Sequence, residues 1–157
     1  MEVCSTDKII TEARTWGGTP YRHQHSAKGR GCDCLGFVRG VWRNVIGPEP
    51  MTAPNYSASW DEGAKTELLL NMTKRLFVSS DMKPTPGDVL VFRMKRGAVA
   101  KHCAILTETY ELNDNGRIIT NGKMIHAINR FHVHETDFNN WWKRKMVFSG
   151  SFPLETI

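Results

Sequence analysis

The residue of this sequence with the clearest chemical potential is Cys34, which lies at the predicted first turn of a helix, directly after a glycine-containing loop. Backbone N–H groups at a helix N-terminus carry partial positive charge, so they stabilise a thiolate and lower the cysteine pKa. The same groups can hold the oxyanion of an acyl-transfer intermediate. Asp33 fits the helix cap, and Gly36 leaves room for close approach. Cys34 is therefore a candidate nucleophile, and its position fits a small buried core residue equally well.

Two histidines in predicted strands are candidates for the base that a thiol nucleophile needs. His102 opens a strand and shares a face with Ala104 and Leu106, and His126 lies within the next strand. The second histidine would orient the first. A histidine flanked by apolar residues in a strand is more often a core residue, but the pair together with a cysteine at a helix start favours catalysis.

The other histidines raise the question of a metal site. They form two His-x-His pairs, His23 with His25 and His132 with His134. Zinc sites usually use two cysteines separated by two to four residues, together with a second similar pair. One residue separates Cys32 from Cys34, and no second pair exists. We therefore expect no metal and no cofactor, and we interpret His132 and His134 as strand residues that border a cleft.

The four cysteines could also form disulfides. Cys32 and Cys34 are too close in the chain for an easy bridge. The polar start of the sequence predicts no signal peptide, so we expect reduced thiols. Cys103 should point away from His102 and act as a buried core thiol, and Cys4 should be exposed near a frayed terminus.

Helices and strands must position these residues. The spacing of apolar side chains predicts helices over residues 5–16 and 33–46 and a third from about Ser59. Residues 17–32 form a loop whose length is unusual unless it is functional. Further along, the pattern predicts a hairpin turn at 113–116, a short helix over 137–142, and strands over 88–93, 102–106, 124–128, 131–135 and 146–152. Helices first and strands later indicate an α+β domain with a mostly antiparallel sheet.

Length and composition fit one globular domain over residues 1–157, with 40% hydrophobic and 24% charged residues. No apolar run approaches the roughly 20 residues of a membrane-spanning helix, so we expect no membrane insertion. The net charge of +5 is spread evenly. The densest basic cluster, Trp141–Lys145, could bind a polyanion, but three charges favour a solvated helix face with two tryptophans reaching inward, and we expect no nucleic acid.

Five motifs together resemble the NlpC-type cell-wall cysteine peptidases. They occur in the order found in that family, cover most of the chain from about residue 5 to 152, and are Trp16–Tyr21, Gly31–Val38, Pro86–Phe92, His102–Leu106 and Met124–Ala127. The amino-acid sequences of residues 18–24, 38–43 and 100–103 are most similar to the branch of the family encoded by tailed phages and gene transfer agents.

The resemblance implies a papain-like fold, with N-terminal helices on a sheet of five to six strands, and a peptidoglycan stem-peptide hydrolase. The bond cleaved in such enzymes is commonly that between D-γ-glutamate and a diamino acid. By position, Cys34 matches the nucleophile, His102 the base, and His126 the residue that orients the base. Tyr21 matches a tyrosine that assists the oxyanion or substrate, although packing of the loop is nearly as good an explanation. Asp33 matches an acidic residue that can meet the amino end of the stem peptide.

One position departs from the family. Leu35 stands where serine is common after the nucleophile, which removes a polar contact to substrate and leaves the exact bond open. Two alternatives also stay open: a wall-binding or structural tail-tip component with little turnover, and a papain-like amidase or acyltransferase on another substrate.

The resemblance further implies a particle-borne enzyme. We expect it in a phage-like tail, or in the bacterial cytoplasm before assembly, and we expect it to act in the periplasm or cell wall. Its partner would then be a tail or hub protein, contacted through Pro48–Pro54 or Trp141–Lys145.

Overall fold

Helix α2 (Cys34–Val45) is the central element of the fold. The computed structural model describes residues 5–51 and 66–154, and it confirms the helix predicted over 33–46 to within one residue at each end. Phe37, Val38 and Val41 recur at helical spacing and are buried, so one face of α2 packs into the core. The position of Cys34 is thus set by the best-packed helix of the chain.

Helix α1 (Ser5–Thr15) and the residues after it pack closely on α2. A Cβ atom at Gly40 would lie 2.0 Å from the Trp16 ring, so only glycine permits this approach. The Trp16 ring also meets Phe37 edge to face, with 6.0 Å between the ring centroids. These contacts fix the two helices against each other.

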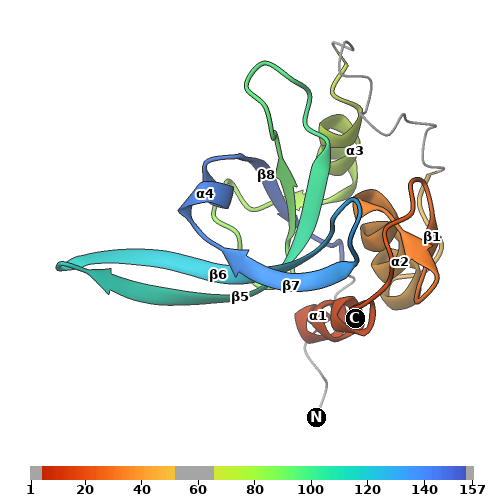
Figure 1. Ribbon diagram of the computed structural model, residues 1–157, viewed down its shortest axis with the longest axis horizontal. Helices are drawn as coiled ribbons and strands as arrows, with labels where there is room; N and C mark the ends of the chain where they lie inside the picture. The colour runs from red at the N-terminus through yellow and green to blue at the C-terminus, as the bar shows by residue number, and fades with distance from the viewer. Residues whose placement is uncertain (1–4, 52–65, 155–157) are drawn as a thin grey trace.

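A six-stranded antiparallel sheet carries the second half of the chain, in the order β3-β8-β4-β5-β6-β7. Its strands are β3 (Val78–Ser79), β4 (Val89–Phe92), β5 (His102–Asp114), β6 (Arg117–Ala127), β7 (Val133–Phe138) and β8 (Met146–Ser151). Helix α3 (Leu68–Leu76) precedes the sheet, and the short helix α4 (Asn140–Lys143) lies between β7 and β8. The predicted α+β class is therefore confirmed (Figure 1).

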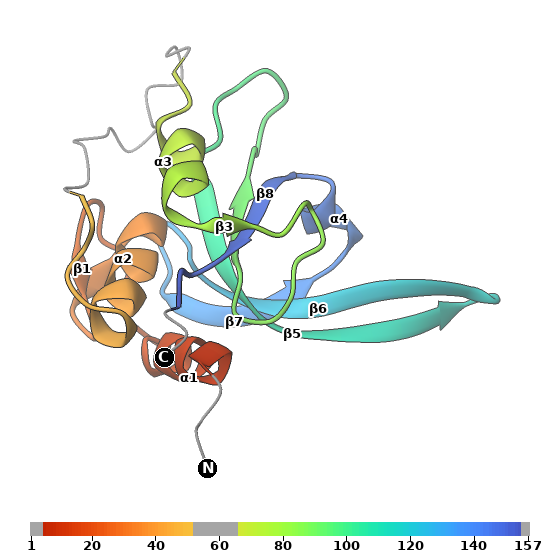
Figure 2. The same cartoon turned by 180° about the vertical axis from the view of Figure 1, so that it is seen from behind.

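The two faces of the sheet are covered differently. Val91, Cys103 and Ile125 join the larger buried cluster, to which α1, α2 and α3 contribute. Phe92 and Met124 belong to a smaller cluster on the other face, against which Trp142 of α4 packs. Helices α1 and α4 accordingly lie apart in both views (Figures 1 and 2). The strand that begins at His102 therefore meets both clusters.

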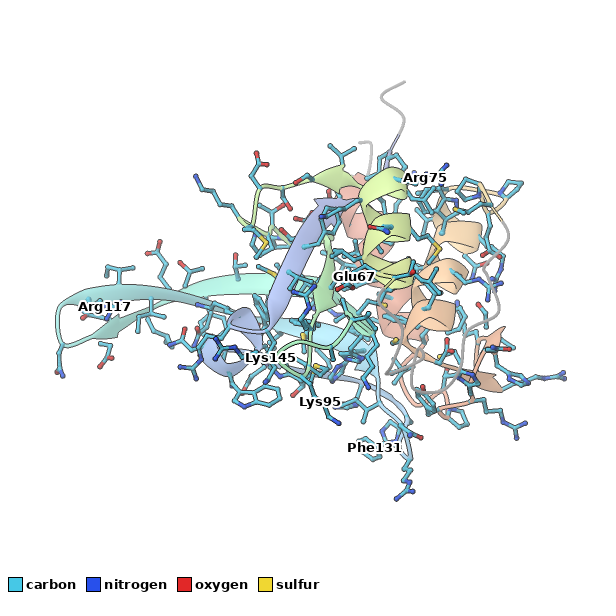
Figure 3. The ribbon with its side chains drawn as sticks, turned by 90° about the horizontal axis from the view of Figure 1, so that it is seen from above. Glu67, Arg75, Lys95, Arg117, Phe131 and Lys145 are labelled. Carbon is cyan, nitrogen blue, oxygen red and sulfur yellow. The ribbon has the colours of Figure 1, made fainter. Side chains whose placement is uncertain are left out.

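Strands β5 and β6 extend far beyond the predicted spans of 102–106 and 124–128. Their outer parts pair only with each other, from Tyr110 opposite Asn121 to Asp114 opposite Arg117, and form an arm that leaves the body of the molecule (Figures 1 and 3). Asn115 and Gly116, with φ of 53° and 85°, make the predicted turn at the tip.

Several boundaries differ from the sequence prediction. The expected loop at 17–32 contains a small antiparallel hairpin, β1 (Ser26–Ala27) with β2 (Gly31–Cys32). The strand expected over 131–135 runs instead over β7 to Phe138, so the following helix is only one turn long. The proposed start of the third helix near Ser59 lies outside the described residues. No helix in the described part of the chain is long and apolar enough to span a bilayer.

Candidate active site

Cys34 is the first residue of α2, and the cap of that helix explains how it is held. One carboxylate oxygen of Asp33 accepts the Gly36 N–H at 2.7 Å, and the other accepts the Gln24 N–H at 2.7 Å. The carboxylate is almost fully buried. A Cβ at Gly36 would lie 1.9 Å from the His25 carbonyl oxygen, which confirms the predicted close approach at this glycine. The structure thus gives Asp33 a capping role, while its contact with substrate stays a prediction.

The sulfur of Cys34 is surrounded by groups that favour the thiolate. Hydrogen bonds from Cys103 and from His102 lower its pKa to about 5, against the opposing effect of burial. The Cys34 thiol, when protonated, donates to the Lys101 carbonyl oxygen at 3.7 Å. The same hydrogen bond to Cys34, together with burial, raises the pKa of Cys103, so Cys103 keeps its proton and acts as the donor. Near neutral pH the site therefore favours a Cys34 thiolate.

The two histidines that the sequence singled out, His102 and His126, are hydrogen-bonded to each other. Nε2 of His102 lies 2.8 Å from Nδ1 of His126, which leaves Nδ1 of His102 as the nitrogen that can serve Cys34. Burial, and then the positive charge on His102, lowers the pKa of His126 to about 2, so that ring stays neutral. A neutral, fully buried His126 can orient His102 without competing for its proton.

Tyr21 and Cys32 lie close enough to Cys34 for its charge to act on both. The two residues pair as neighbouring backbone segments, and Tyr21 is half-buried beside the main core. Burial and the nearby Cys34 raise the pKa of the Tyr21 phenol, so it keeps its proton and can donate a hydrogen bond. Burial, Asp33 and Cys34 raise the pKa of Cys32 to about 12, so Cys32 stays a thiol and Cys34 alone of the two is activated.

The segment that leads into His102 is braced by a residue that the sequence did not single out. One carboxylate oxygen of Glu67 binds Nη2 of Arg93 at 2.6 Å, and the other accepts the Ala100 N–H at 2.8 Å. Glu67 precedes α3 and lies over this segment (Figure 3). The start of β5, and with it His102, is thereby tied to α3.

Aromatic rings form the wall behind the histidines. The Phe92 ring stacks on His102 with 5.9 Å between centroids, and the Trp142 ring lies 5.7 Å from His102 and 5.3 Å from His126. Trp142 reaches inward as predicted, but Trp141 is 49% exposed, with Nζ of Lys145 4.5 Å from its ring centre. The prediction of two inward tryptophans was therefore wrong for Trp141, because a one-turn helix can turn only one of two adjacent side chains to the sheet.

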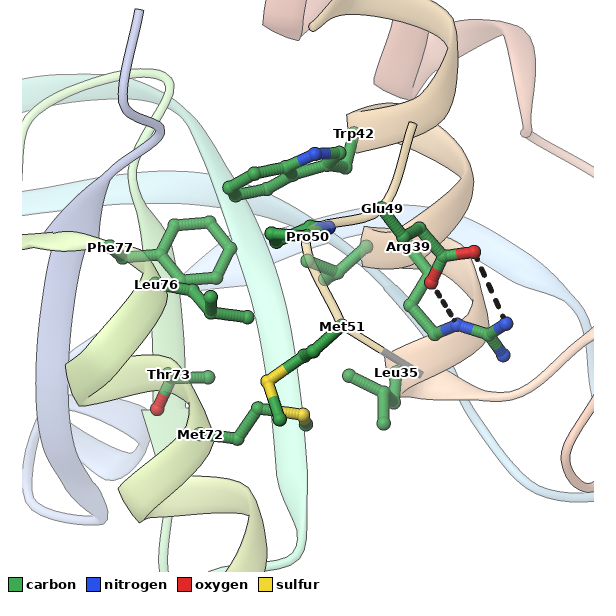
Figure 4. Close-up of a pocket in the computed structure, with 11 residues that line it drawn as sticks. Leu35, Arg39, Trp42, Glu49, Pro50, Met51, Met72, Thr73, Leu76 and Phe77 are labelled. Carbon is green, nitrogen blue, oxygen red and sulfur yellow. Dashed lines mark hydrogen bonds and ion pairs between the residues drawn. The ribbon is translucent and has the colours of Figure 1, made fainter. Parts of the chain in front are cut away.

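Leu35 lines a small apolar cavity between α2 and α3, of about 40 Å³ (Figure 4). Trp42, Met72 and Phe77 contribute to its wall, whereas Cys34, His102 and His126 do not. The residue after the candidate nucleophile therefore contributes to packing at the helix pair. Within the described ranges, no three side chains of His, Cys, Asp or Glu gather as a metal site.

Comparisons with known proteins identify the fold. The family model for the NlpC/P60 family matches residues 16–150. The crystal structure of the NlpC/p60 domain of peptidoglycan hydrolase SagA is similar, with a TM-score of 0.56, 24% identity, and coverage of 94% of this chain and 98% of that one. Comparison with curated protein sequences finds no match.

Longer proteins contain the same fold. An NlpC/P60 family protein from Bacillus cereus ATCC 10987 has a TM-score of 0.60 and 20% identity, with coverage of 94% of this chain and 40% of that one. A protein similar to a lipoprotein of the NLP/P60 family, from Staphylococcus aureus subsp. aureus Mu50, has a TM-score of 0.58 and 16% identity, with coverage of 99% and 43%. The chain thus spans less than half the length of these two structures. It belongs to the NlpC/P60 family, and it is a cysteine peptidase with the papain-like fold of that family.

Proposed function

We propose that the protein hydrolyses the stem peptides of peptidoglycan through a Cys34 thiolate and His102. The observation that carries this proposal is the environment of Cys34. Its pKa is about 5, and His102 beside it is bound to a neutral His126 at 2.8 Å. The membership in the NlpC/P60 family and the similarity to the domain of a peptidoglycan hydrolase support the choice of substrate.

The chemistry follows from this arrangement. The thiolate of Cys34 attacks the scissile carbonyl carbon, and the carbonyl oxygen takes up the electron pair as an oxyanion. First-turn N–H groups of a helix have no acceptor within the helix. Asp33 binds that of Gly36, so the N–H groups of Cys34 and Leu35, with the Tyr21 hydroxyl, can stabilise that charge. Protonated His102 gives its proton to the leaving amine, and a thioester remains on Cys34. Water, deprotonated by His102, then releases the acid and regenerates the thiolate.

We expect the scissile bond to be that between D-γ-glutamate and the diamino acid. Mass spectrometry of muropeptides after digestion of purified sacculi tests both the activity and the bond. The Cys34→Ala variant should release no stem-peptide fragments. Cys32→Ala is the matched control because that thiol is also buried and adjacent but protonated, and it should cleave like the wild type. Undiminished release by Cys34→Ala would refute the proposal, and a different new terminus would refute the bond.

We further propose that the enzyme works from a phage-like or gene-transfer-agent tail, docked on a tail or hub protein, and meets its substrate in the periplasm or cell wall. This proposal is supported by the sequences of residues 18–24, 38–43 and 100–103, which resemble the branch of the family encoded by tailed phages and gene transfer agents. Immunodetection of the protein in purified particles tests this placement. Particles free of the protein, from cells that express it, would contradict it. Binding to sacculi without release of fragments would instead support a structural tail-tip component.

A further inference from the structure

The protons of the histidine pair can be followed atom by atom. When His102 holds the proton taken from Cys34, both of its ring nitrogens carry hydrogen. Its Nε2–H then donates to Nδ1 of His126, 2.8 Å away. A neutral His126 that accepts at Nδ1 must carry its own proton on Nε2. The reactive state of the pair therefore requires one particular tautomer of His126.

In that tautomer the proton lies on a buried nitrogen that lacks a hydrogen-bond acceptor in the described structure. His126 is fully buried, and among the described residues its Nε2 has no hydrogen-bond partner. A buried donor without an acceptor is costly, so the alternative tautomer, with the proton on Nδ1, would be favoured unless something receives the Nε2–H. In that alternative His126 donates to His102, and it can no longer accept from protonated His102.

Among the described residues, three rings lie against His126, and of these only that of His134 can supply the missing acceptor. His102 of β5 is already bound at Nδ1 of His126. The Trp142 ring of α4 meets His126 edge to face at 5.3 Å, but an indole nitrogen only donates. His134 of β7 is the cross-strand partner of His126, and the centroids of the two rings lie 4.9 Å apart at an angle of 55°.

The backbone prepares His134 for this role. Its Nδ1 lies 3.0 Å from the His132 carbonyl oxygen, which can only accept, so Nδ1 of neutral His134 carries the hydrogen and Nε2 keeps a free lone pair. The χ2 torsion of histidine is broad, so a modest ring rotation can direct that lone pair to His126. We propose that His134 is a positioning residue, whose Nε2 accepts the His126 Nε2–H and so selects the tautomer that supports His102. This inference rests on the proposed roles of Cys34 and His102.

The tautomer can be measured without turnover. Nitrogen-15 NMR of histidine-labelled wild-type protein near neutral pH should show the proton of His126 on Nε2. His134→Phe keeps an aromatic ring but removes the acceptor, and it should shift His126 towards the Nδ1–H form. His134→Gln restores an acceptor and should return the wild-type tautomer. A wild-type His126 protonated on Nδ1 would overturn the inference whatever the variants do.

Kinetics on stem-peptide fragments supply the second readout. Loss of a partner that orients a metal-bound histidine typically costs about 10- to 100-fold in activity, and we expect the lower end of that range here. His134→Phe should therefore lower kcat about 10-fold with little change in KM. His134→Gln should recover most of that loss. His25→Phe is the matched control, because His25 makes the same Nδ1 contact to the carbonyl two residues earlier, at 2.9 Å, and should behave like the wild type.

The two measurements distinguish a failure of the inference about His134 from a failure of the proposed function. A fall in kcat with an unchanged tautomer, or a changed tautomer with unchanged kcat, overturns the positioning role. If Cys34→Ala retains activity, the proposed function fails, whereas the tautomer measurement still decides what His134 does to His126.

Discussion

At the residue scale, the sequence identified which side chains have chemical potential but not all of their neighbours. The helix-start position of Cys34 predicted an activated thiol. The structure adds Cys103 as a hydrogen-bond donor to that sulfur, which the sequence pattern could not reveal. Strand alternation correctly predicted that Cys103 is buried on the face opposite His102. It could not predict that this face meets Cys34, because alternation gives the side of a strand and not what packs against it.

Removal of the Cys103 thiol should make Cys34 less acidic. A hydrogen bond to a charged group is worth about 1.5–3 kcal/mol, which corresponds to roughly one to two pH units. Cys103→Ala should therefore raise the midpoint of the pH dependence of Cys34 alkylation from about 5 by that amount. Cys103→Ser retains a donor of similar size and serves as the control, with a midpoint nearer that of the wild type. Equal midpoints for all three proteins would show that Cys103 does not act on the thiolate.

At the element scale, helices and strands with a strong apolar periodicity could be predicted from the sequence, and those without it could not. Helix α2 has strong apolar periodicity and a capping aspartate, and its prediction was accurate. The outer parts of β5 and β6 are rich in polar residues and pair only with each other, so they lack the buried face on which strand patterns depend. Helix α4 is one turn long. It depends on the Asn139 cap and on the packing of Trp142 against the sheet, and that packing is decided by the tertiary structure rather than by a sequence pattern.

Loss of the cap of α4 should loosen the wall behind the histidines. The Asn139 side chain accepts the N–H groups of Trp141 and Trp142, so it sets where the Trp142 ring lies. Asn139→Ala should lower the free energy of unfolding by about 1 kcal/mol, as measured by urea denaturation, and it should also lower peptidase activity.

Asn140→Ala is the matched control, since the side chain of Asn140 is exposed and belongs to the same turn but does not cap it. If both variants lose equal stability and activity, the cap is not what positions Trp142.

At the scale of the whole molecule, the two histidines of the candidate site link that site to the stability of the fold. The sheet has to bury His126 completely to give it a fixed orientation, and burial is what keeps it neutral. The sequence predicted that a strand would carry this histidine. The degree of burial could not be predicted, because it depends on Trp142 and on strands β5 and β7 together.

The buried His126 should make the protein sensitive to acid. Its pKa is about 2 in the folded protein and about 6.5 when the chain is unfolded, so between these values the unfolded state binds a proton that the folded state does not. Stability is therefore complete above pH ~6.5 and falls as the pH falls, by up to about 1.4 kcal/mol per pH unit. Urea denaturation of Cys34→Ala between pH 8 and pH 5 measures this slope without titration of the thiol. The double variant Cys34→Ala/His126→Gln keeps a neutral polar side chain, and it should lose about 2 kcal/mol less between pH 8 and pH 5. Parallel stability curves for the two proteins would mean that folding leaves the pKa of His126 unchanged, and burial would then not be what keeps this ring neutral.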